Sequence, residues 1–572
     1  MSFPRIKSVS IKNFRSFSND DFEVVKFPEV DLPISIVGYN NSGKTHFIHA
    51  ILRACGMQTK YKESFDEEDF YFQNTGDKAE IKIEFSQSFK VSTIYQVDKE
   101  CHGAHLEIKE DENGTINGFA HAVDAEGKTI IKQERIKGRG LPVLMSSLKD
   151  KLNVIYIDFR ELEKHLLNKS YSLLGKRLKD IKEDFYRSDN LVKNRKNEDI
   201  PRKEYFEQII NFIESNLIKT EAFISLVSEW ETSIKEQLEI ENDSLKISFQ
   251  IPKADEIYDS IAFKLSDHAT KPAVSIEKLG EGFKSMLIIA ILRSLAELNN
   301  GGRIIIFEEP ETFLHEHFQE YFYKVLCKLA ENNQIIYTTH SKKFVDVFNP
   351  QSIVKIVNPD YLKSSIIQPP QESFILDVPK KLDEFELKNP EDFAKYLKTL
   401  EPNIGNILFA SRVIIVEGPH DILAYKTIFE NQVNFALKNI AIVAAWGKDS
   451  IPTIIVLCKL FKTDCFVIHD WDLDNDNDPN TLPEGATEEE KKKQVADKQQ
   501  WTKNKNILDK IENENSRHCN KRNLEKVLDI ERNQKGTVAI YQKLKDKSLE
   551  YVQKQYPKLV SDNLLNFLGI QK

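Results

Sequence analysis

The sequence predicts an α/β protein with two α/β units in series, the first of them interrupted by a helical insertion. Short apolar strands alternate with helix-like segments up to about residue 160, and this alternation returns after about residue 245. The stretch between, residues 161–245, is rich in Lys, Glu and Leu and has no glycine after Gly175, a composition that favours helices. A further block of strands and helices begins at Arg412.

Length and composition are those of a large globular protein. The 572 residues are 40% hydrophobic, with 80 Lys and Arg against 89 Asp and Glu, which is not the composition of a disordered chain. No apolar run approaches the roughly 18 residues that cross a membrane, and the first residues lack the apolar stretch of a signal peptide. The six cysteines form no CxxC pair, so neither a disulfide framework nor a zinc ribbon is indicated. We expect a cytoplasmic protein with no membrane contact.

Five regions are expected along the chain. An alternating strand at 6–14 and an apolar strand at 34–37 precede a helix-like segment at 45–55. Further strands are expected at 79–86 and 153–157. The expected regions are residues 1–160 and 246–375 as the two parts of a nucleotide-binding domain, 161–245 as the helical insertion, 376–410 as a helical connector and 411–572 as a second domain.

A phosphate-binding loop follows the strand at 34–37. The segment GYNNSGKT, residues 38–45, matches the pattern GxxxxGK[ST] between a strand and a helix. Small residues let backbone N–H groups wrap phosphates at a helix N-terminus, Lys44 neutralises the β- and γ-phosphates, and the Thr45 hydroxyl binds Mg²⁺. The residues expected to bind ATP in this loop are Gly38, Asn41, Gly43, Lys44 and Thr45.

Paired carboxylates end another predicted strand. The apolar run IIIFEEP ends in Glu308 and Glu309, and two adjacent carboxylates at a strand end are costly without a cation. We interpret Glu308 as facing Mg²⁺ and Glu309 as the base that activates water. The strand at 334–339 then ends in His340. The order of phosphate loop, acid pair and histidine is that of ABC-type (ATP-binding-cassette) ATPases.

A glycine-containing segment between these motifs, LGEGFKS at 279–285, opens a further helix. Its position matches the ABC signature loop, which reaches the nucleotide of the opposite subunit, so Gly282 is expected to contact nucleotide in a homodimer. The usual serine of that loop is Gly280 here, a departure that removes its hydroxyl. Arg15, in NFRSF, resembles the arginine that approaches nucleotide in related ATPases; a solvent-exposed arginine is the alternative.

The insertion is short for its class. Pro201 divides residues 161–245 into two arms of about 40 residues, which reach ~60 Å at most at about 1.5 Å per residue. This excludes the long coiled coil of chromosome-organising and break-repair relatives. The insertion is suited to be a dimerisation arm, and an insert that only extends the fold is the alternative.

The second domain carries acids at two strand ends. The segment VIIVEGPHD places Glu417 and Asp421 after an apolar strand. A later strand, in FVIHDWD, ends in Asp470 and Asp472. Adjacent strands of a parallel sheet end at one edge, so we expect these carboxylates to meet there and to favour Mg²⁺ or Mn²⁺. Solvated strand-end acids are the alternative for either segment alone, and an EF-hand is excluded because its turn glycine is missing.

The pair EGxxD and DxD is the pattern of Toprim domains, whose metal-dependent chemistry acts on phosphodiesters. An ABC-type P-loop ATPase domain with a helical insertion, followed by a Toprim (Rossmann-like) domain, resembles the OLD (overcoming lysogenization defect) family of nucleases. The nuclease subunit of the Gabija antiphage system and some retron-associated effectors belong to this family. The motifs that carry the resemblance are GYNNSGKT, LGEGFKS, IIIFEEPE, TTHS, VEGPHD and HDWD, in that order.

The resemblance implies an ATP-controlled, divalent-metal-dependent DNA endonuclease of antiviral defence. It also implies a homodimer or homotetramer, and either a helicase-like partner (Gabija) or a reverse transcriptase with a structured RNA (retron). The implied site residues are Glu417 and Asp421 as metal ligands or base, Asp470 and Asp472 as metal ligands, Glu525 in NLEKVL as a further acid, and Lys543 or Lys545 as a late lysine that stabilises phosphate charge. For each of these two lysines, an ordinary surface lysine is the alternative.

The expected mechanism is a two-metal in-line displacement. Phosphate contacts are expected from the Lys-rich segment that follows the acidic loop, with a solvated helix face as the alternative. Two other function classes are open: strand passage or primer synthesis, for which no DNA-gate or zinc-ribbon module is seen, and an ATP-driven DNA-binding or sensing protein whose Toprim domain binds metal without cleaving. The candidate phosphate contacts are Lys491, Lys492, Lys493, Lys498, Lys503 and Lys505.

Overall fold

The structure is a computed structural model, and it describes residues 3–570 of the chain apart from gaps. The chain divides into two compact units: Met1–Tyr156, Asn299–Glu311 and Glu316–Lys572 form the first, Ile157–Leu298 and Thr312–His315 the second. Within the described residues, no helix is long and apolar enough to cross a membrane. The gaps are 57–64, 92–98, 134–147, 149–150, 167–190, 195–196, 218–219, 222–223, 226, 229–263, 266–273, 276–277, 298–301, 359–361, 370–380, 383–384, 387–389, 431–437, 474–486, 512, 514–515, 521–522 and 531–535.

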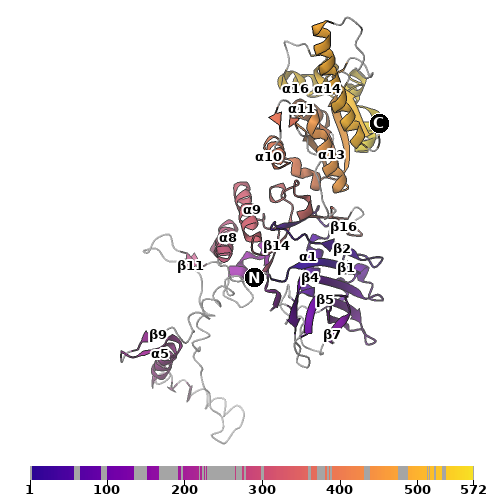
Figure 1. The fold of residues 1–572 in the computed structure, drawn as a ribbon. Coiled ribbons are helices and arrows are strands. Elements are labelled where there is room, and N and C mark those ends of the chain that lie inside the picture. The colour runs from indigo at the N-terminus through magenta and orange to yellow at the C-terminus, as the bar shows by residue number, and fades with distance from the viewer. Residues whose placement is uncertain are drawn as a thin grey trace. The chain divides into compact units, whose positions relative to one another are not determined.

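The phosphate loop and the paired acids follow two strands of one six-stranded sheet, with strand β14 (labelled in Figure 1) between them. In order across the sheet, the strands are β16 (Ser365–Ile367), β15 (Ile353–Val357), β3 (Ile34–Val37), β14 (Gln334–Thr339), β13 (Ile304–Glu308) and β8 (Val154–Asp158). The four strands from β15 to β13 run parallel. Every residue of β3, β13 and β14 is buried. Their largely apolar sequences follow from this, because a parallel sheet is covered on both faces.

A second sheet of the same unit is antiparallel throughout. Its apolar face shares one hydrophobic core with helix α1 (Lys44–Ala54) and with β3 and β13. In its third strand, Ile81 and Ile83 are buried while Lys82 is exposed, as expected of a strand with one face on the core. The strands, in order across the sheet, are β2 (Glu23–Lys26), β1 (Ile6–Lys12), β4 (Ala79–Val91), β5 (Lys99–Glu110), β6 (Ile116–Val123) and β7 (Thr129–Gln133).

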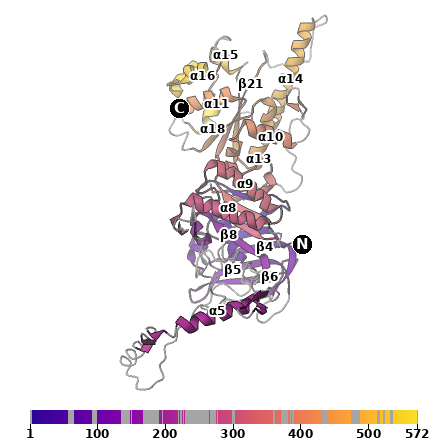
Figure 2. The ribbon, with the colours of Figure 1, turned by 90° about the vertical axis from the view of Figure 1, so that its left-hand side faces the viewer.

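The second unit contains the described part of the helical insertion (Figure 2). A hairpin of β9 (Leu191–Lys193) and β10 (Asp199–Pro201) leads into helix α5 (Arg202–Leu217). Pro201 therefore ends the hairpin directly before the helix, in keeping with its predicted role as a break, because proline disrupts a helix interior. Helix α8 (Glu281–Glu297) of the same unit packs against α3 (Leu162–Leu166). Most of the two predicted arms lies outside the described residues.

The C-terminal part of the first unit is built on a four-stranded parallel sheet. Its order is β20 (Ile440–Ala444), β19 (Arg412–Val416), β21 (Asp464–Asp470) and β22 (Arg517–Asn520). One face packs on α11 (Pro419–Glu430), α16 (Thr537–Leu544), α17 (Leu549–Gln555) and α18 (Asp562–Leu568). The other packs on α13 (Ile451–Leu460) and α14 (Glu488–Lys510). The expected connector contains the hairpin β17 (Lys381–Leu382) and β18 (Phe385–Glu386) and then helix α10 (Pro390–Leu400).

Candidate functional site

Two glycines give the phosphate loop its shape. Gly38 has φ +156° and Gly43 has φ +104°, conformations that residues with a Cβ rarely adopt. A Cβ at Gly38 would lie 2.2 Å from the Ile356 carbonyl oxygen, and a Cβ at Gly43 would lie 2.4 Å from Ser364 Oγ. Gly43 is also the N-cap of α1, whose first N–H groups are available to phosphate oxygens. Asn41, between them, has φ +62°.

Lys44 folds back over this loop. Its Nζ donates hydrogen bonds of 3.0 Å to the carbonyl oxygens of Gly38 and Tyr39. The side chain is buried, and burial lowers the pKa of Lys44 to about 8, against the opposing charge of Glu309 and two neighbouring glutamates. The ammonium is thus held at the mouth of the phosphate loop by weak acceptors that phosphate oxygens can replace.

The hydroxyl and the carboxylate predicted to share Mg²⁺ lie in direct contact. Thr45 Oγ1 donates a hydrogen bond of 2.5 Å to Glu308 Oε1, and the Tyr156 hydroxyl donates one of 2.6 Å to Glu308 Oε2. Glu308 is fully buried, and such oxygen donors fit Mg²⁺. Tyr156 was not among the residues predicted from the sequence; a tyrosine within the apolar strand VIYID was the available signal.

Glu309 and His340 lie at the ends of neighbouring strands, with 3.9 Å between Glu309 Oε1 and His340 Nε2. Glu309 has a left-handed backbone, with φ +47°, and its N–H donates to Thr338 Oγ1 at 3.1 Å. Burial, and then the charge of Lys44, lowers the pKa of His340 to about 4, so the imidazole is neutral at pH 7. Glu311, which was not predicted from the sequence either, accepts a hydrogen bond of 2.5 Å from the His340 N–H.

Two further predicted nucleotide contacts have different surroundings. Gly282 lies in the first turn of α8, in the second unit. A Cβ at Gly280, just before that helix, would have no atom within 4 Å. Arg15 is not a solvated arginine, because its side chain is 17% exposed and its Nη2 lies 3.0 Å from Asp69 Oδ1. Its Nη1 also lies 2.6 Å from His49 Nδ1 on α1, the helix that follows the phosphate loop.

The acids of the C-terminal sheet meet at one edge, as predicted. Glu417 directly follows β19, and its Oε2 accepts a hydrogen bond of 3.1 Å from the backbone N–H of Asp470, the last residue of β21. In the first turn of α11, Asp421 Oδ2 accepts a hydrogen bond of 3.0 Å from the Gly418 N–H. Asn520, at the end of β22, donates through Nδ2 to Asp470 Oδ1 at 3.1 Å. Three neighbouring strands thus end in one group of polar side chains.

Burial and mutual repulsion raise the pKa values of these carboxyl groups. Burial, followed by the charges of Glu417 and Glu525, raises the pKa of Asp421 to about 7. Burial, followed by Asp421 and Glu417, raises that of Asp470 to about 8. Burial also raises the pKa of Glu417, against the charge of Lys448. Acids that resist ionising together are the arrangement that a divalent cation stabilises.

Two regions of the chain match known domain families. Residues 5–345, more than half of the chain, match the AAA ATPase domain family. Residues 408–472 match the Toprim domain of overcoming lysogenization defect protein-like proteins. The chain belongs to the OLD family. Its fold is accordingly an ABC-type ATPase domain followed by a Toprim domain.

Relatives of the OLD family match long stretches of the chain. It is 26% identical over 521 residues to the OLD nuclease of Thermus scotoductus, and the aligned region covers 86% of this chain and 88% of the relative. It is 22% identical over 448 residues to endonuclease GajA of Bacillus cereus, and this alignment covers 74% of the chain and 68% of GajA. It is 25% identical over 225 residues to the Old nuclease of Escherichia phage P2, which covers 36% of each chain.

A buried lysine adjoins the acids of this OLD-family Toprim domain. Lys448 Nζ donates to Asp472 Oδ2 at 2.7 Å and to Gln500 Oε1 at 3.3 Å. The Lys448 side chain is 3% exposed, whereas that of Asp472 is 35% exposed. Lys448 was not among the site residues predicted from the sequence; a lysine directly after the turn glycine Gly447, before the DxD motif, was the available signal.

The late acid faces the cluster, and the late lysines do not contact it. Glu525 Oε1 lies 3.2 Å from His420 Nδ1, and its charge contributes to the raised pKa of Asp421. Lys543 and Lys545 lie at the end of α16 and are exposed. Within the described part of the chain, neither forms an ion pair with these acids. The role of the late lysine therefore stays a prediction.

The donor set of the OLD-family Toprim site fits a hard divalent cation, because it consists of carboxylate and amide oxygens. Asp421 Oδ1 is buried and accepts no hydrogen bond from the described residues, so it is a buried acceptor that a cation can use. In the described chain, three ligand atoms lie within 4.8 Å of one another at Glu80, His105 and Glu107, but the Toprim acids are spaced more widely. That wider spacing suits ions that retain water ligands.

The Lys-rich segment forms helix α14, which begins with a capping box at Thr487. Lys491 Nζ lies 2.9 Å from Glu488 on the same helix. Lys503 Nζ lies 2.7 Å from Asp449 Oδ2, one residue after Lys448. The lysines of α14 therefore extend from the solvent to the neighbourhood of the acid cluster, and their contact with phosphates stays a prediction.

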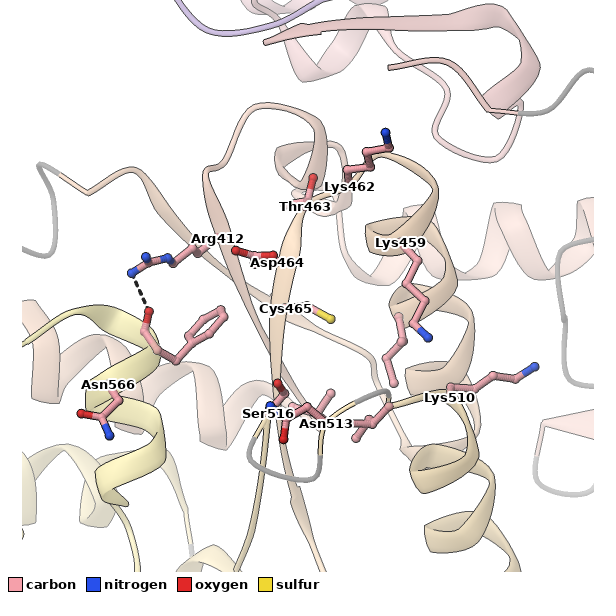
Figure 3. Close-up of a pocket in the computed structure, with 14 residues that line it drawn as sticks. Arg412, Lys459, Lys462, Thr463, Asp464, Cys465, Lys510, Asn513, Ser516 and Asn566 are labelled. Atoms are coloured by element: carbon pink, nitrogen blue, oxygen red, sulfur yellow. Dashed lines mark hydrogen bonds between the residues drawn. The ribbon is translucent and has the colours of Figure 1, made fainter. Parts of the chain in front are cut away.

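A cavity of about 580 Å³ lies at the opposite edge of the same sheet (Figure 3). Arg412 and Asp464, the first residues of β19 and β21, line it together with Lys459 and Lys462. The Arg412 guanidinium donates a hydrogen bond of 2.6 Å to the Phe567 carbonyl oxygen. The acid cluster follows the carboxyl ends of the strands, where ligands of open parallel sheets bind. This cavity lies at the amino ends of the same strands and is therefore separate from the acid cluster.

Proposed function

We propose that this OLD-family chain is an ATP-regulated, divalent-metal-dependent DNA endonuclease that acts in bacterial antiphage defence, in the cytoplasm. The observation that supports it most strongly is the meeting of Glu417, Asp421 and Asp470 at one edge of the Toprim sheet. Relatives named as an OLD nuclease and as endonuclease GajA support the same class of reaction.

The proposed reaction is hydrolysis of a DNA phosphodiester by in-line attack of water. Glu417, Asp470 and Asp472 would hold Mg²⁺ or Mn²⁺, and the bound ions would polarise the phosphate and acidify water. Asp421, with a pKa raised to about 7, is suited to hold a metal or to accept the proton of water, because a base works best with a pKa near the working pH. Lys448, whose Nζ donates a hydrogen bond of 2.7 Å to Asp472 Oδ2, holds the Asp472 side chain in place.

DNA must approach an acidic pocket in a chain with a net charge of −9. We assign the compensating positive surface to α14, whose lysines lead towards the acid cluster. Phosphate contacts of this kind release counterions, so DNA binding is expected to weaken steeply as salt is raised.

ATP would act through the phosphate loop of the other domain. In the proposed ATPase site Lys44, Thr45 and Glu308 hold Mg-ATP, Glu309 activates water and Gly282 contacts nucleotide across a homodimer. The two domains share buried contacts within the first unit: Lys355 Nζ, on β15, donates to Thr463 Oγ1 at 2.7 Å, directly before β21. Nucleotide binding next to β15 can therefore influence the strand that ends in Asp470.

The proposal also includes a homo-oligomer and a partner molecule. A homodimer follows from signature loops that act in trans, and a homotetramer from family resemblance. The resemblance also names two alternative partners, a helicase-like protein or a reverse transcriptase with structured RNA, and a neighbouring gene of either kind would distinguish them.

A plasmid-nicking assay tests the proposal. We expect wild-type protein to nick supercoiled plasmid when Mg²⁺ or Mn²⁺ is present, and Asp470→Ala to lose nicking while it still hydrolyses ATP. Nicking that persists in Asp470→Ala would contradict the assigned site. Absence of nicking in the wild type under every metal and ATP condition would favour the DNA-binding or sensing alternative.

A further inference from the structure

A second cluster of side chains that can bind metal, made of residues outside both proposed reaction sites, lies on the antiparallel sheet of the ATPase domain. Glu80 lies on β4, His105 and Glu107 lie on β5, and His121 lies on β6. Glu80 is directly opposite Glu107, and His105 is directly opposite His121. Because side chains alternate between the two faces of a strand, these four project from the same face.

The spacing of the ligand atoms is that of a metal centre. His105 Nε2 lies 3.1 Å from Glu80 Oε1 and 3.9 Å from Glu107 Oε1, and His121 Nε2 lies 3.5 Å from Glu107 Oε2. Two atoms that bind one Zn²⁺ tetrahedrally, each at about 2.0–2.1 Å, lie about 3.3 Å apart. Glu80, His105 and Glu107 each offer one atom within 4.8 Å of the others.

The register of β4 and β5 alone favours a cation at this position, because it places two carboxylates opposite one another. Like charges directly opposite one another destabilise an antiparallel pair, and Glu80 and Glu107 are such a pair. Lys78 supplies the cation in the structure: its Nζ lies 3.0 Å from Glu80 Oε1 and 2.8 Å from Glu107 Oε1. Its side chain is 46% exposed, so it can move into solvent and leave the carboxylates to another cation.

We propose that Glu80, His105 and Glu107 bind a divalent transition-metal ion, Zn²⁺ in the first instance, with His121 as a fourth ligand. Imidazole nitrogen with carboxylate oxygen is a ligand set that Zn²⁺ accepts and that Mg²⁺ rarely uses. Burial, as the largest cause, lowers the pKa of His105, so its imidazole is in the neutral, metal-binding form at pH 7. The ion would tie β4, β5 and β6 together, and this role does not depend on the proposed nuclease activity.

Zn²⁺ binding to the full chain by equilibrium dialysis tests the proposal, with all proteins carrying Asp470→Asn to weaken the Toprim site. We expect one Zn²⁺ to bind per chain and to raise the unfolding temperature. His105→Gln and Glu107→Gln should each weaken binding by about tenfold or more, because even the outer partners of metal ligands change affinity that much. His102→Gln, on the same strand but outside the cluster, is the matched control and should bind as the parent does.

Lys78→Ala keeps the test decisive if a ligand variant fails to fold. Removal of the competing ammonium should tighten Zn²⁺ binding, a gain that misfolding cannot imitate. The proposal is overturned if the parent binds no Zn²⁺, if His105→Gln binds as tightly as the parent, or if Lys78→Ala leaves the affinity unchanged or weaker. The cluster would then be an ion-pair network closed by Lys78.

Discussion

The backbone N–H of Asp470 donates a hydrogen bond of 3.1 Å to the carboxylate of Glu417. This bond joins the ends of β21 and β19 through two residues predicted to hold the same cations. It uses the Asp470 main chain, so the Asp470 carboxylate, with one oxygen hydrogen-bonded to Asn520, still faces the other acids. The geometry therefore fixes two repelling carboxyl groups beside one another, as a divalent-cation site requires.

The pH dependence of stability reports this repulsion. The pKa of Asp421 is raised to about 7 and that of Asp470 to about 8, from an ordinary value of 3.8. The folded protein thus binds these protons more tightly than the unfolded chain, and the stabilisation is present below about pH 4 and lost as the pH rises through 7 to 8. We expect the unfolding temperature of metal-free protein to fall between about pH 6 and 9.

Metal binding should show the opposite trend over the same range. Mg²⁺ or Mn²⁺ competes with the protons, so its affinity should rise with pH and binding should release protons, which calorimetry in buffers of different ionisation enthalpy counts. The control is Asp470→Asn, which should lose part of both effects. Identical pH profiles for Asp470→Asn and wild type would show that Asp470 does not titrate in this window.

Lys448 and Asp472 should respond unequally to mutation. Asp472→Ala leaves a buried ammonium whose remaining hydrogen-bond partner, among the described residues, is Gln500, which we expect to cost about 1–3 kcal/mol of unfolding free energy. Lys448→Met leaves the partly exposed Asp472 carboxylate in contact with water and should cost less. Urea unfolding of both variants and the double mutant measures this order, and a larger loss in Lys448→Met would contradict it.

ATP control should disappear with the phosphate-loop lysine. Lys44→Ala removes the ammonium that lies 3.0 Å from the Gly38 and Tyr39 carbonyl oxygens, so nucleotide phosphates lose their main counter-charge. We expect DNA cleavage by Lys44→Ala to be the same at every ATP concentration, while that of wild type changes. Lys328→Ala, an exposed lysine on α9 (Glu316–Ala330), is the control. A Lys44→Ala titration curve that follows the wild type rules out this coupling.

The Tyr156 hydroxyl should contribute to the binding of Mg²⁺ but little to the binding of nucleotide without metal. Tyr156→Phe removes the hydroxyl that donates a hydrogen bond of 2.6 Å to Glu308 Oε2, and the loss of such an outer partner weakens metal binding by about tenfold or more. We expect weaker Mg-ATP binding, with ATP binding in EDTA unchanged. Tyr541→Phe, an exposed tyrosine, is the matched control. Equal losses with and without Mg²⁺ would show a structural role.

The strands that carry the sites could be predicted from sequence because parallel strands are buried on both faces. The runs ISIV, IIIFE and VIIV are buried and mainly apolar, and each leads into the loop or acids predicted to carry the chemistry. Since carboxyl ends of such strands share an edge, the meeting of Glu417 and Asp470 followed from the pattern. The order of the six motifs indicated the resemblance to the OLD family.

The partners of those residues could not be predicted in the same way. Tyr156, Glu311 and Lys448 reach the sites from other strands and turns, and their roles depend on tertiary contacts that leave no periodic signal. His105 and His121 form a cluster with Glu80 only because of strand register, which alternation alone does not define. The pairing of Arg15 with Asp69 depends on the tertiary fold in the same way, and the contact of Arg15 with nucleotide stays a prediction.

The central claim is that Glu417 and Asp470 hold a common cation, and anomalous scattering from crystals soaked in Mn²⁺ tests it most directly. We predict a Mn²⁺ peak bound by carboxylate oxygens of both residues, and its loss in Asp470→Asn crystals soaked in the same way. A Toprim edge without Mn²⁺, or Mn²⁺ bound elsewhere with Glu417 and Asp470 uninvolved, would contradict the claim.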